Sequence, residues 1–508
     1  MSTSTGAPRR GAAPTGRGGF PAGRGRGGAP AGSSSSTKGK ERAPAPTGRR
    51  FLIFCDGTGE VAPEKSSGSE SNLAKLALSM AERGSEGQEQ ICFYQQGLGT
   101  VPFTHPIQKI NEMAMGKGIV DHIKIIYNYI APVSSQTGPS SRTAPSTDDD
   151  HPRIQEGDTL CFFGFSRGAA TARFAADFIA TAGFPAGGQT KLANVDVFFQ
   201  AWMDASDSSR YRVPQSVRLI MPKVECVGVF DTVEAIGPPR STQQRARSGV
   251  PPTIPKLSTK AKLLHGDIQY GFQALALHEM RQAFLPEVWG PPRALGQVIK
   301  QTWFLGKHSD VGGGPSSDRP DSGLASTAFR WMIAQLNSIG IIIAATGGLG
   351  ENLAIPEEEA GQGQVRTQGT LSGGIQGGQA RRTPGRYSVG MEKVHESVRL
   401  QGLANLSQLP ETPSLADLIG QLRQQGESYV WVNGNIVMKE DTDIAPPEGS
   451  TTAQATNAPL HPLPSTARPG GGVVPQRPQG RGGGVRGGVR GGARGGARGA
   501  GPSGQTGA

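Results

Sequence analysis

Cysteine is scarce in this chain of 508 residues, which has four: Cys55, Cys92, Cys161 and Cys226. Each lies in a short apolar run, and none belongs to a CxxC motif or to a Cys/His pair with the spacing of metal ligands. So few cysteines in so long a chain argue against a disulfide framework and against a zinc site. We expect four reduced thiols that pack as small hydrophobic side chains, and we expect no metal and no cofactor.

Long hydrophobic runs are also missing. The N-terminus has no apolar segment of the kind that a secretory signal needs. No run approaches the about 18 apolar residues that a membrane-spanning helix requires. The sequence therefore predicts neither secretion nor a membrane span, and we expect a cytoplasmic protein, with the nucleus as an alternative location.

Acidic residues are nearly absent from the two ends of the chain. Residues 1–50 hold ten Lys or Arg and one acidic residue, and residues 451–508 hold seven Arg and no acidic residue. The formal net charge of +11 therefore belongs to the ends, because 35 basic and 40 acidic residues remain between them. Segments 1–48 and 441–508 are too poor in apolar residues to fold, so both are predicted to be disordered tails. The Arg-Gly-Gly repeat at 481–498 suggests weak RNA binding.

Apolar strands alternate with amphipathic helices between the tails. This alternation is typical of an α/β fold with a mostly parallel central sheet and helices on both faces. We expect this domain at 49–345, a flexible Gly/Gln-rich insert at 346–390, and an extension at 391–440. An Asn-Gly pair within 429–438 predicts a hairpin at an edge of the sheet. The predicted strands cover 50–55, 91–95, 159–164, 224–230 and 301–306, and the predicted helices 71–82, 119–131, 167–181 and 323–338.

A Gly-x-Ser-x-Gly motif follows the third predicted strand, as Gly164-Phe165-Ser166-Arg167-Gly168. An apolar strand precedes it and a helix follows it, which is the setting of a nucleophile elbow in an α/β-hydrolase. The two glycines let the tight turn close where side chains would collide with neighbouring backbone. The motif predicts Ser166 as a nucleophile, and the alternative is a Gly-rich turn in which this serine only caps the helix.

A serine nucleophile needs a base and an acid that orients the base. Of the eight histidines, His308 follows a late strand and opens a Gly-rich loop, which is where an α/β-hydrolase carries its base. Asp231 ends the strand VECVGVF and lies between Ser166 and His308 in sequence, so it is the candidate acid, with a turn or helix cap as its alternative role. Asp310 is the rival acid, but it is so near His308 that we expect it to bond the backbone of its own loop.

An oxyanion hole requires two backbone N–H donors. Arg167, which follows the nucleophile, supplies one, and Gly57 or Thr58 in the Gly-rich turn that starts at Asp56 supplies the other, with the aspartate in a supporting role. Phosphatases of the haloacid dehalogenase type carry a similar turn after their first strand. Their nucleophilic aspartate would fall on Phe54 here, which excludes that chemistry.

Together these residues resemble an α/β-hydrolase domain of unknown function that is widespread in fungi and bacteria, a family that includes phospholipase effectors of type VI secretion systems. The resemblance spans roughly residues 49–345. It implies a lipid or phospholipid ester as substrate, with the family's triad on Ser166, Asp231 and His308. Glu60 departs from the asparagine that members often carry there. The matching blocks are FCDGTG at 54–59, YQQGLGT at 94–100, GFSRGA at 164–169, GVFDTVEAIG at 228–237, FLPEVWG at 284–290 and WFLGKHSDVGGG at 303–314.

The sequence thus predicts a serine hydrolase that cleaves a carboxylic ester through an acyl-enzyme. Segments 101–118, 205–222 and 237–262 are candidate lids, and the oligomeric state is open. The alternative function is an RNA-binding or scaffold protein that acts through its Arg/Gly-rich tails and carries a catalytically silent hydrolase fold.

Overall fold

The computed structural model describes the central part of the chain. The Arg-Gly-Gly repeat at 481–498 and most of both predicted tails lie outside the described residues, so the weak RNA binding expected of the tails stays a prediction. Most of the candidate lids 101–118 and 237–262 also lie outside them, whereas most of 205–222 is described. The described residues are 48–60, 70–98, 117–132, 151–186, 195–213, 217–233, 257, 259–314, 323–344, 380–400, 414–443 and 456–464.

An 11-stranded sheet forms the centre of the described part. Its strands are β1 (Arg50–Cys55), β2 (Gln90–Gln95), β3 (Thr159–Phe165), β6 (Lys223–Phe230), β7 (Tyr270–Ala276), β8 (Val298–Phe304), β9 (Glu392–His395), β10 (Gln421–Gln425), β11 (Ser428–Asn433), β12 (Ile436–Asp441) and β13 (Leu460–Pro462). They lie in the order β10-β11-β12-β9-β8-β7-β6-β3-β1-β2-β13. Every neighbouring pair from β12 to β13 is parallel, and only the β10-β11-β12 ladder is antiparallel. The separate pair β4 (Phe184–Pro185) and β5 (Leu219–Ile220) is antiparallel.

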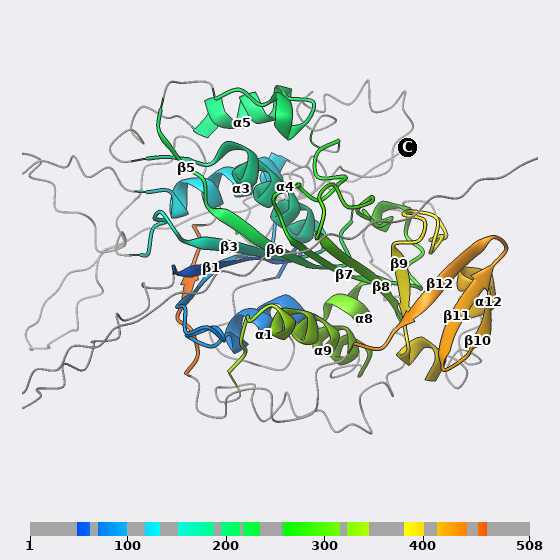
Figure 1. Cartoon of the computed structure of the whole chain (residues 1–508). Helices are drawn as coiled ribbons and strands as arrows, with labels where there is room; N and C mark the ends of the chain where they lie inside the picture. Colours follow the sequence, from blue (N-terminus) through cyan, green and yellow to red (C-terminus); the bar gives the residue numbers. More distant parts are fainter. Residues whose placement is uncertain are drawn as a thin grey trace, which may run out of the picture. The chain divides into compact units, whose positions relative to one another are not determined.

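Helices cover both faces of this sheet, as the composition of its strands requires (Figure 1). The first strand is buried throughout, and its side chains alternate between two hydrophobic clusters, one containing Phe51 and Ile53 and the other Leu52 and Phe54. The first cluster takes in α3, α4 and α5, and the second α1 and α9. The helices are α1 (Asn72–Ser79), α3 (Lys117–Ile130), α4 (Ser166–Ala182), α5 (Val195–Asp204), α8 (His308–Gly312), α9 (Gly323–Ser338) and α12 (Leu415–Ile419), with 3-10 turns η2 (Ser208–Arg210) and η3 (Gln282–Phe284).

The carboxyl ends of the parallel strands gather the predicted site residues at one edge. Ser166 follows β3 directly, Asp231 follows β6 directly, and His308 comes shortly after β8. Strand β1 pairs with β2 on one side and β3 on the other, so the chain reverses its direction across the sheet there. Open α/β sheets place their ligand sites at the carboxyl edge beside such a reversal.

The predicted α/β fold is confirmed, and each predicted strand and helix corresponds to an observed one within three residues at either end. Ser71 caps α1 by accepting a hydrogen bond from the N–H of Ala74 at 3.0 Å. The predicted hairpin is formed by β11 and β12, with Gly434 at a φ of 61°, and it extends one edge of the sheet. Strand β7 and helix α5 were not predicted.

Two expectations of disorder are wrong in part. Residues 380–390 of the predicted insert and 456–464 of the predicted C-terminal tail have defined structure. In the second segment, β13 pairs in parallel with β2 and Leu463 is buried. These short segments have little apolar surface of their own, but the backbone and core of the sheet supply their partners.

The four cysteines are free and buried, as predicted. Burial is the main cause that raises the pKa of each thiol above its ordinary value, so all four stay protonated near neutral pH. No helix in the described ranges combines the length and the apolar character needed to cross a lipid bilayer.

Candidate active site

The turn between β3 and α4 holds Ser166 in a strained backbone conformation. Its φ is 59°, in the left-handed region that residues with a side chain rarely adopt. The residue is buried and begins α4, so the N-terminus of a long helix starts at the serine itself. Such strain persists only where the surrounding structure imposes it, and it is a feature of nucleophile elbows.

The two glycines of the motif are required by close contact with backbone. A Cβ added at Gly164 would lie 2.5 Å from the Cα of Ala169, and one added at Gly168 would lie 2.1 Å from the carbonyl oxygen of Cys55. Strand β1 therefore runs against the first turn of α4 with no room for a methyl group. This contact is the physical reason for the spacing of the Gly-x-Ser-x-Gly motif.

We expect Gly168→Ala to destabilise the fold by about 3 kcal/mol, because the added methyl group must push two backbone segments apart. Urea denaturation followed by circular dichroism measures the change in the free energy of unfolding. Gly266→Ala is the matched control, since a Cβ there meets no atom within 4 Å. Equal stability of the two variants would contradict the packing described for the elbow.

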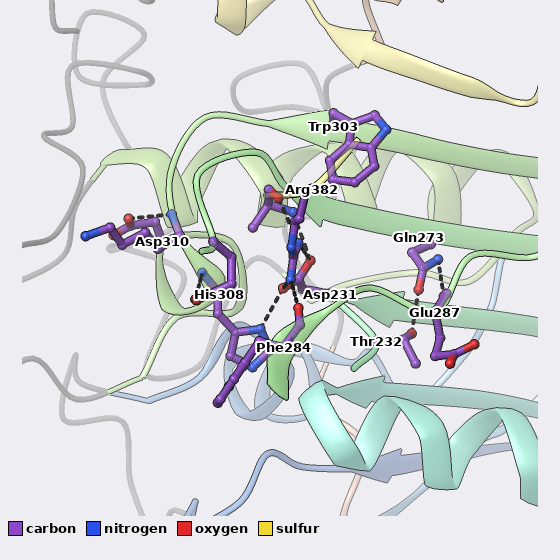
Figure 2. Close-up of polar contacts among 12 residues, drawn as sticks. Asp231, Thr232, Gln273, Phe284, Glu287, Trp303, His308, Asp310 and Arg382 are labelled. Carbon is purple, nitrogen blue, oxygen red and sulfur yellow. Dashed lines mark hydrogen bonds and ion pairs between the residues drawn. The ribbon is translucent and has the colours of Figure 1, made fainter. Parts of the chain in front are cut away.

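Asp231 and His308 form a buried hydrogen-bonded pair, drawn in Figure 2. The Nδ1 atom of His308 lies 2.6 Å from Oδ2 of Asp231, and both residues are buried. An ionised carboxylate only accepts hydrogen bonds, so the proton of this bond is on Nδ1. A neutral imidazole in this tautomer has an unprotonated Nε2, which is the state that a general base requires.

Arg382 binds the same carboxylate from the other side. Its Nη1 lies 2.6 Å from Oδ1 of Asp231 and its Nη2 lies 2.9 Å from Oδ2. Burial opposes ionisation of the aspartate, but the guanidinium charge and then the hydrogen bond from His308 hold the pKa of Asp231 well below its usual range. These contacts therefore favour the ionised form of Asp231.

Two aromatic rings fix the orientation of the imidazole. Phe165 stacks on His308 with ring centroids 4.8 Å apart, and Phe284 meets it edge-on at 4.9 Å. Because Phe165 directly precedes Ser166, this stacking connects the β3–α4 turn to His308, which is itself hydrogen-bonded to Asp231. The structure thus brings the neighbourhoods of all three predicted residues together at one edge of the sheet.

A buried polar chain holds the segment after Asp231 in place (Figure 2). Thr232 donates from its hydroxyl to Oε1 of Gln273 at 2.5 Å, and Nε2 of Gln273 donates to the carbonyl of Glu287 at 3.0 Å. The N–H of Glu287 donates back to the carbonyl of Thr232 at 2.9 Å. These bonds fix the start of the turn whose first residue, Asp231, has a φ of 41°.

Asp56 organises the Gly-rich turn after β1. Its carboxylate accepts hydrogen bonds from the hydroxyl of Ser71 at 2.7 Å, from the N–H of Gly57 at 2.6 Å, and from the hydroxyl of Tyr94. Burial raises the pKa of Asp56, and these hydrogen bonds oppose the rise. The N–H of Gly57 is therefore bonded to this carboxylate and does not face an oxyanion, as one prediction had it. The N–H of Thr58, the next residue in the turn, is the remaining candidate donor.

Glu60, the residue at which the sequence departs from its resemblance, lies between this turn and the end of α8. A Cβ added at Gly314 would come within 3.0 Å of its Oε1. Burial, and then the negative charge of Asp56, raise the pKa of Glu60 to about 7. This carboxyl group therefore titrates near neutral pH at the border of the site.

The segment around His308 differs from the predicted loop. His308 begins the short helix α8, and the side chain of Asp310 caps the N-terminus of this helix. As predicted, Asp310 accepts a hydrogen bond from its own segment, from the N–H of Lys307 at 2.8 Å. Glu279 accepts from the N–H of His308 at 3.4 Å and forms an ion pair with Arg281. Sequence reasoning missed Glu279, because it follows β7, a strand that was not predicted.

Three of the other histidines that the structure describes are buried in the core. Burial lowers the pKa of His122, His278 and His395 to about 4, which keeps their rings neutral in the core. In the described ranges, no group of three or more His, Cys, Asp or Glu residues is arranged to hold a metal ion.

Comparison with known proteins identifies the family. The model of the type VI secretion phospholipase effector Tle1-like catalytic domain matches residues 49–335, which is more than half of the chain. No curated protein matches. An uncharacterized protein from Pseudomonas aeruginosa is similar in structure, with 18% sequence identity and a TM-score of 0.33. The match covers 63% of this chain and 49% of that protein, so the chain spans about half the length of that protein. The structure of the Tle1 effector bound to the VgrG spike is also similar, with 14% sequence identity to this chain and a TM-score of 0.37. That match covers 62% of this chain and 78% of the other. The chain therefore belongs to the family of Tle1-like phospholipase effectors, whose catalytic domain it carries at residues 49–335.

Proposed function

We propose that this protein is a serine hydrolase that cleaves a carboxylic ester of a phospholipid, with Ser166 as nucleophile, His308 as general base and Asp231 as orienting acid. The observation that carries the proposal is the buried 2.6 Å hydrogen bond between His308 and Asp231, together with the stacking of His308 on Phe165, which directly precedes a serine with a φ of 59°. Family membership supports the choice of a lipid ester over other esters.

The proposed reaction is acyl transfer in two steps. Nε2 of His308 takes the hydroxyl proton of Ser166 while Oγ attacks the ester carbonyl. The same proton then passes to the leaving alcohol, and the acyl group stays on Oγ. In the second step water loses a proton to Nε2 and attacks the acyl carbon. The bond from the acyl carbon to Oγ then breaks, Nε2 returns the proton to Oγ, and a fatty acid and the free serine are released. Asp231 stabilises the imidazolium in both steps, and the N–H groups of Arg167 and Thr58 are the proposed oxyanion donors.

Labelling by a fluorophosphonate probe tests the nucleophile. We expect the wild-type protein to react with the probe, and a digest followed by mass spectrometry to find the adduct on the peptide that contains Ser166. The reason is that a fluorophosphonate reacts with a serine that a neighbouring base activates. Phosphatidylcholine vesicles and a short-chain p-nitrophenyl ester, assayed in parallel, then separate a lipid hydrolase from a soluble esterase. A wild-type protein that neither labels nor hydrolyses either ester would refute the proposed function.

A further inference from the structure

Arg382 has more partners in the site than an ordinary salt bridge. Its guanidinium is completely buried and donates to both oxygens of Asp231, to the carbonyl of Ala276 at 2.7 Å, and to the carbonyl of Phe284 at 2.5 Å. The partners stand at the ends of β6, β7 and η3. A buried cation is costly unless it is paired and hydrogen-bonded, so a side chain held in this way has a specific place. The residue also lies outside the segment 49–335 that defines the family.

The decisive atom is Oδ2 of Asp231, because it accepts from both the guanidinium and the imidazole. The Nη2 of Arg382 donates to it at 2.9 Å, and Nδ1 of His308 donates to it at 2.6 Å. A positive charge that forms on the imidazole would share one carboxylate with a guanidinium that is already charged. The carboxylate favours the imidazolium, and the guanidinium opposes it. The N–H of Ala276 is the neutral donor to this carboxylate, at 2.9 Å from Oδ1.

We propose that Arg382 is a positioning residue of the reaction, which fixes Asp231 against His308 and delays protonation of the imidazole until the ester is attacked. This inference rests on the proposed function of Ser166, His308 and Asp231. The guanidinium has two roles that can be separated. Its forked geometry orients the carboxylate, and its charge sets how readily the base takes a proton.

Other charged groups lie on the elements around the base and must be considered together with Arg382. They come from the strand ends, from α8 itself, and from the helices that pack against α8. Each is the same in wild type and in a variant at position 382, so a difference between the two proteins reports on Arg382. These groups are Glu279 with its partner Arg281, His278, Lys307 and Asp310, Arg167 after Ser166, Lys75 on α1, Arg330 on α9, and Glu60 and Asp56 at the border of the site.

The test is the pH profile of kcat/KM for ester hydrolysis by the full chain. Arg382→Gln removes the charge, and we expect the acidic limb of the profile to move up by about one pH unit, because the imidazolium loses an opposing charge. Arg382→Lys keeps the charge and loses the fork, so we expect a lower kcat with the acidic limb where wild type has it. Arg386→Gln is the matched control, since it removes an exposed arginine of the same segment.

An Arg382→Gln protein that folds and keeps the wild-type acidic limb would overturn the inference, as would an Arg382→Lys protein whose limb moves up. The lysine variant decides the matter if the glutamine variant fails to fold. A second readout needs no turnover: the ring resonances of His308, followed by NMR, should titrate at higher pH in Arg382→Gln than in wild type. If no ester is hydrolysed, the proposed function fails, but the NMR titration still tests the coupling between Arg382 and His308.

Discussion

Ser166→Ala is expected to lower kcat for ester hydrolysis by about a million-fold and to abolish labelling by a fluorophosphonate. Removal of Oγ leaves no atom to carry the acyl group, and the loss of one member of a triad costs about as much as the loss of all three. The fold should remain, because alanine and serine have the same restriction at the φ of 59° that this position imposes. Initial rates on phosphatidylcholine vesicles measure the effect.

Ser428→Ala serves as the control for this experiment. Ser428 is an exposed residue at the start of β11, on the hairpin that extends the sheet. Its replacement should leave both turnover and labelling at the wild-type level. Hydrolysis by Ser166→Ala at a tenth of the wild-type rate or more would mean that another residue performs the attack, and the mechanism would have to be abandoned.

Asp231→Asn is expected to lower kcat by about ten-thousand-fold, because an amide no longer fixes the imidazole in the tautomer that a base needs. It should also destabilise the fold by about 3 kcal/mol, since Arg382 would remain buried without a counter-charge. Steady-state kinetics and urea denaturation measure the two effects on the same protein.

A double variant separates the two effects of Asp231→Asn. Adding Arg382→Gln removes the unpaired cation, so stability should return in part while activity stays low. Asp267→Asn is the control, because the side chain of Asp267 is largely exposed. A single variant that keeps a tenth of the wild-type kcat would show that Asp231 does not orient the base.

The parts of the fold that the sequence predicted are those with a local signal. Strand β1 is apolar at every position after Arg50 and stops at a Gly-rich turn, and the Ser166 motif has its strand before it and its helix after it. Strand β7 was not predicted because its sequence, YGFQALA, contains several residues that favour helices. Only its place between β6 and β8 makes it a strand, which is a tertiary effect. Strand β13, with Pro462 at its end, lies at an edge where a missing N–H is tolerated.

The position of the three candidate residues in the fold was predictable from the sequence, but the residues that hold them in place were not. Ser166, Asp231 and His308 each follow a strand that the sequence marks, so their meeting at one edge could be foreseen. Arg382 lies 151 residues after Asp231 at the end of a Gly/Gln-rich stretch, and no periodicity links the two. The sequence shows only that Arg381 and Arg382 follow the uncharged residues 367–380. This pattern does not identify Asp231 as the carboxylate that Arg382 binds.

The position of Arg382 and β9 in the chain has a consequence for biosynthesis. During translation Ser166, Asp231 and His308 emerge first, but Arg382, which binds Asp231, and the strand that pairs with β8 follow only near residues 382–395. A nascent chain that has exposed Ser166 therefore still lacks the clamp on Asp231. Under the proposed function we therefore expect a ribosome-bound chain to lack ester hydrolysis until most of the polypeptide has left the exit tunnel.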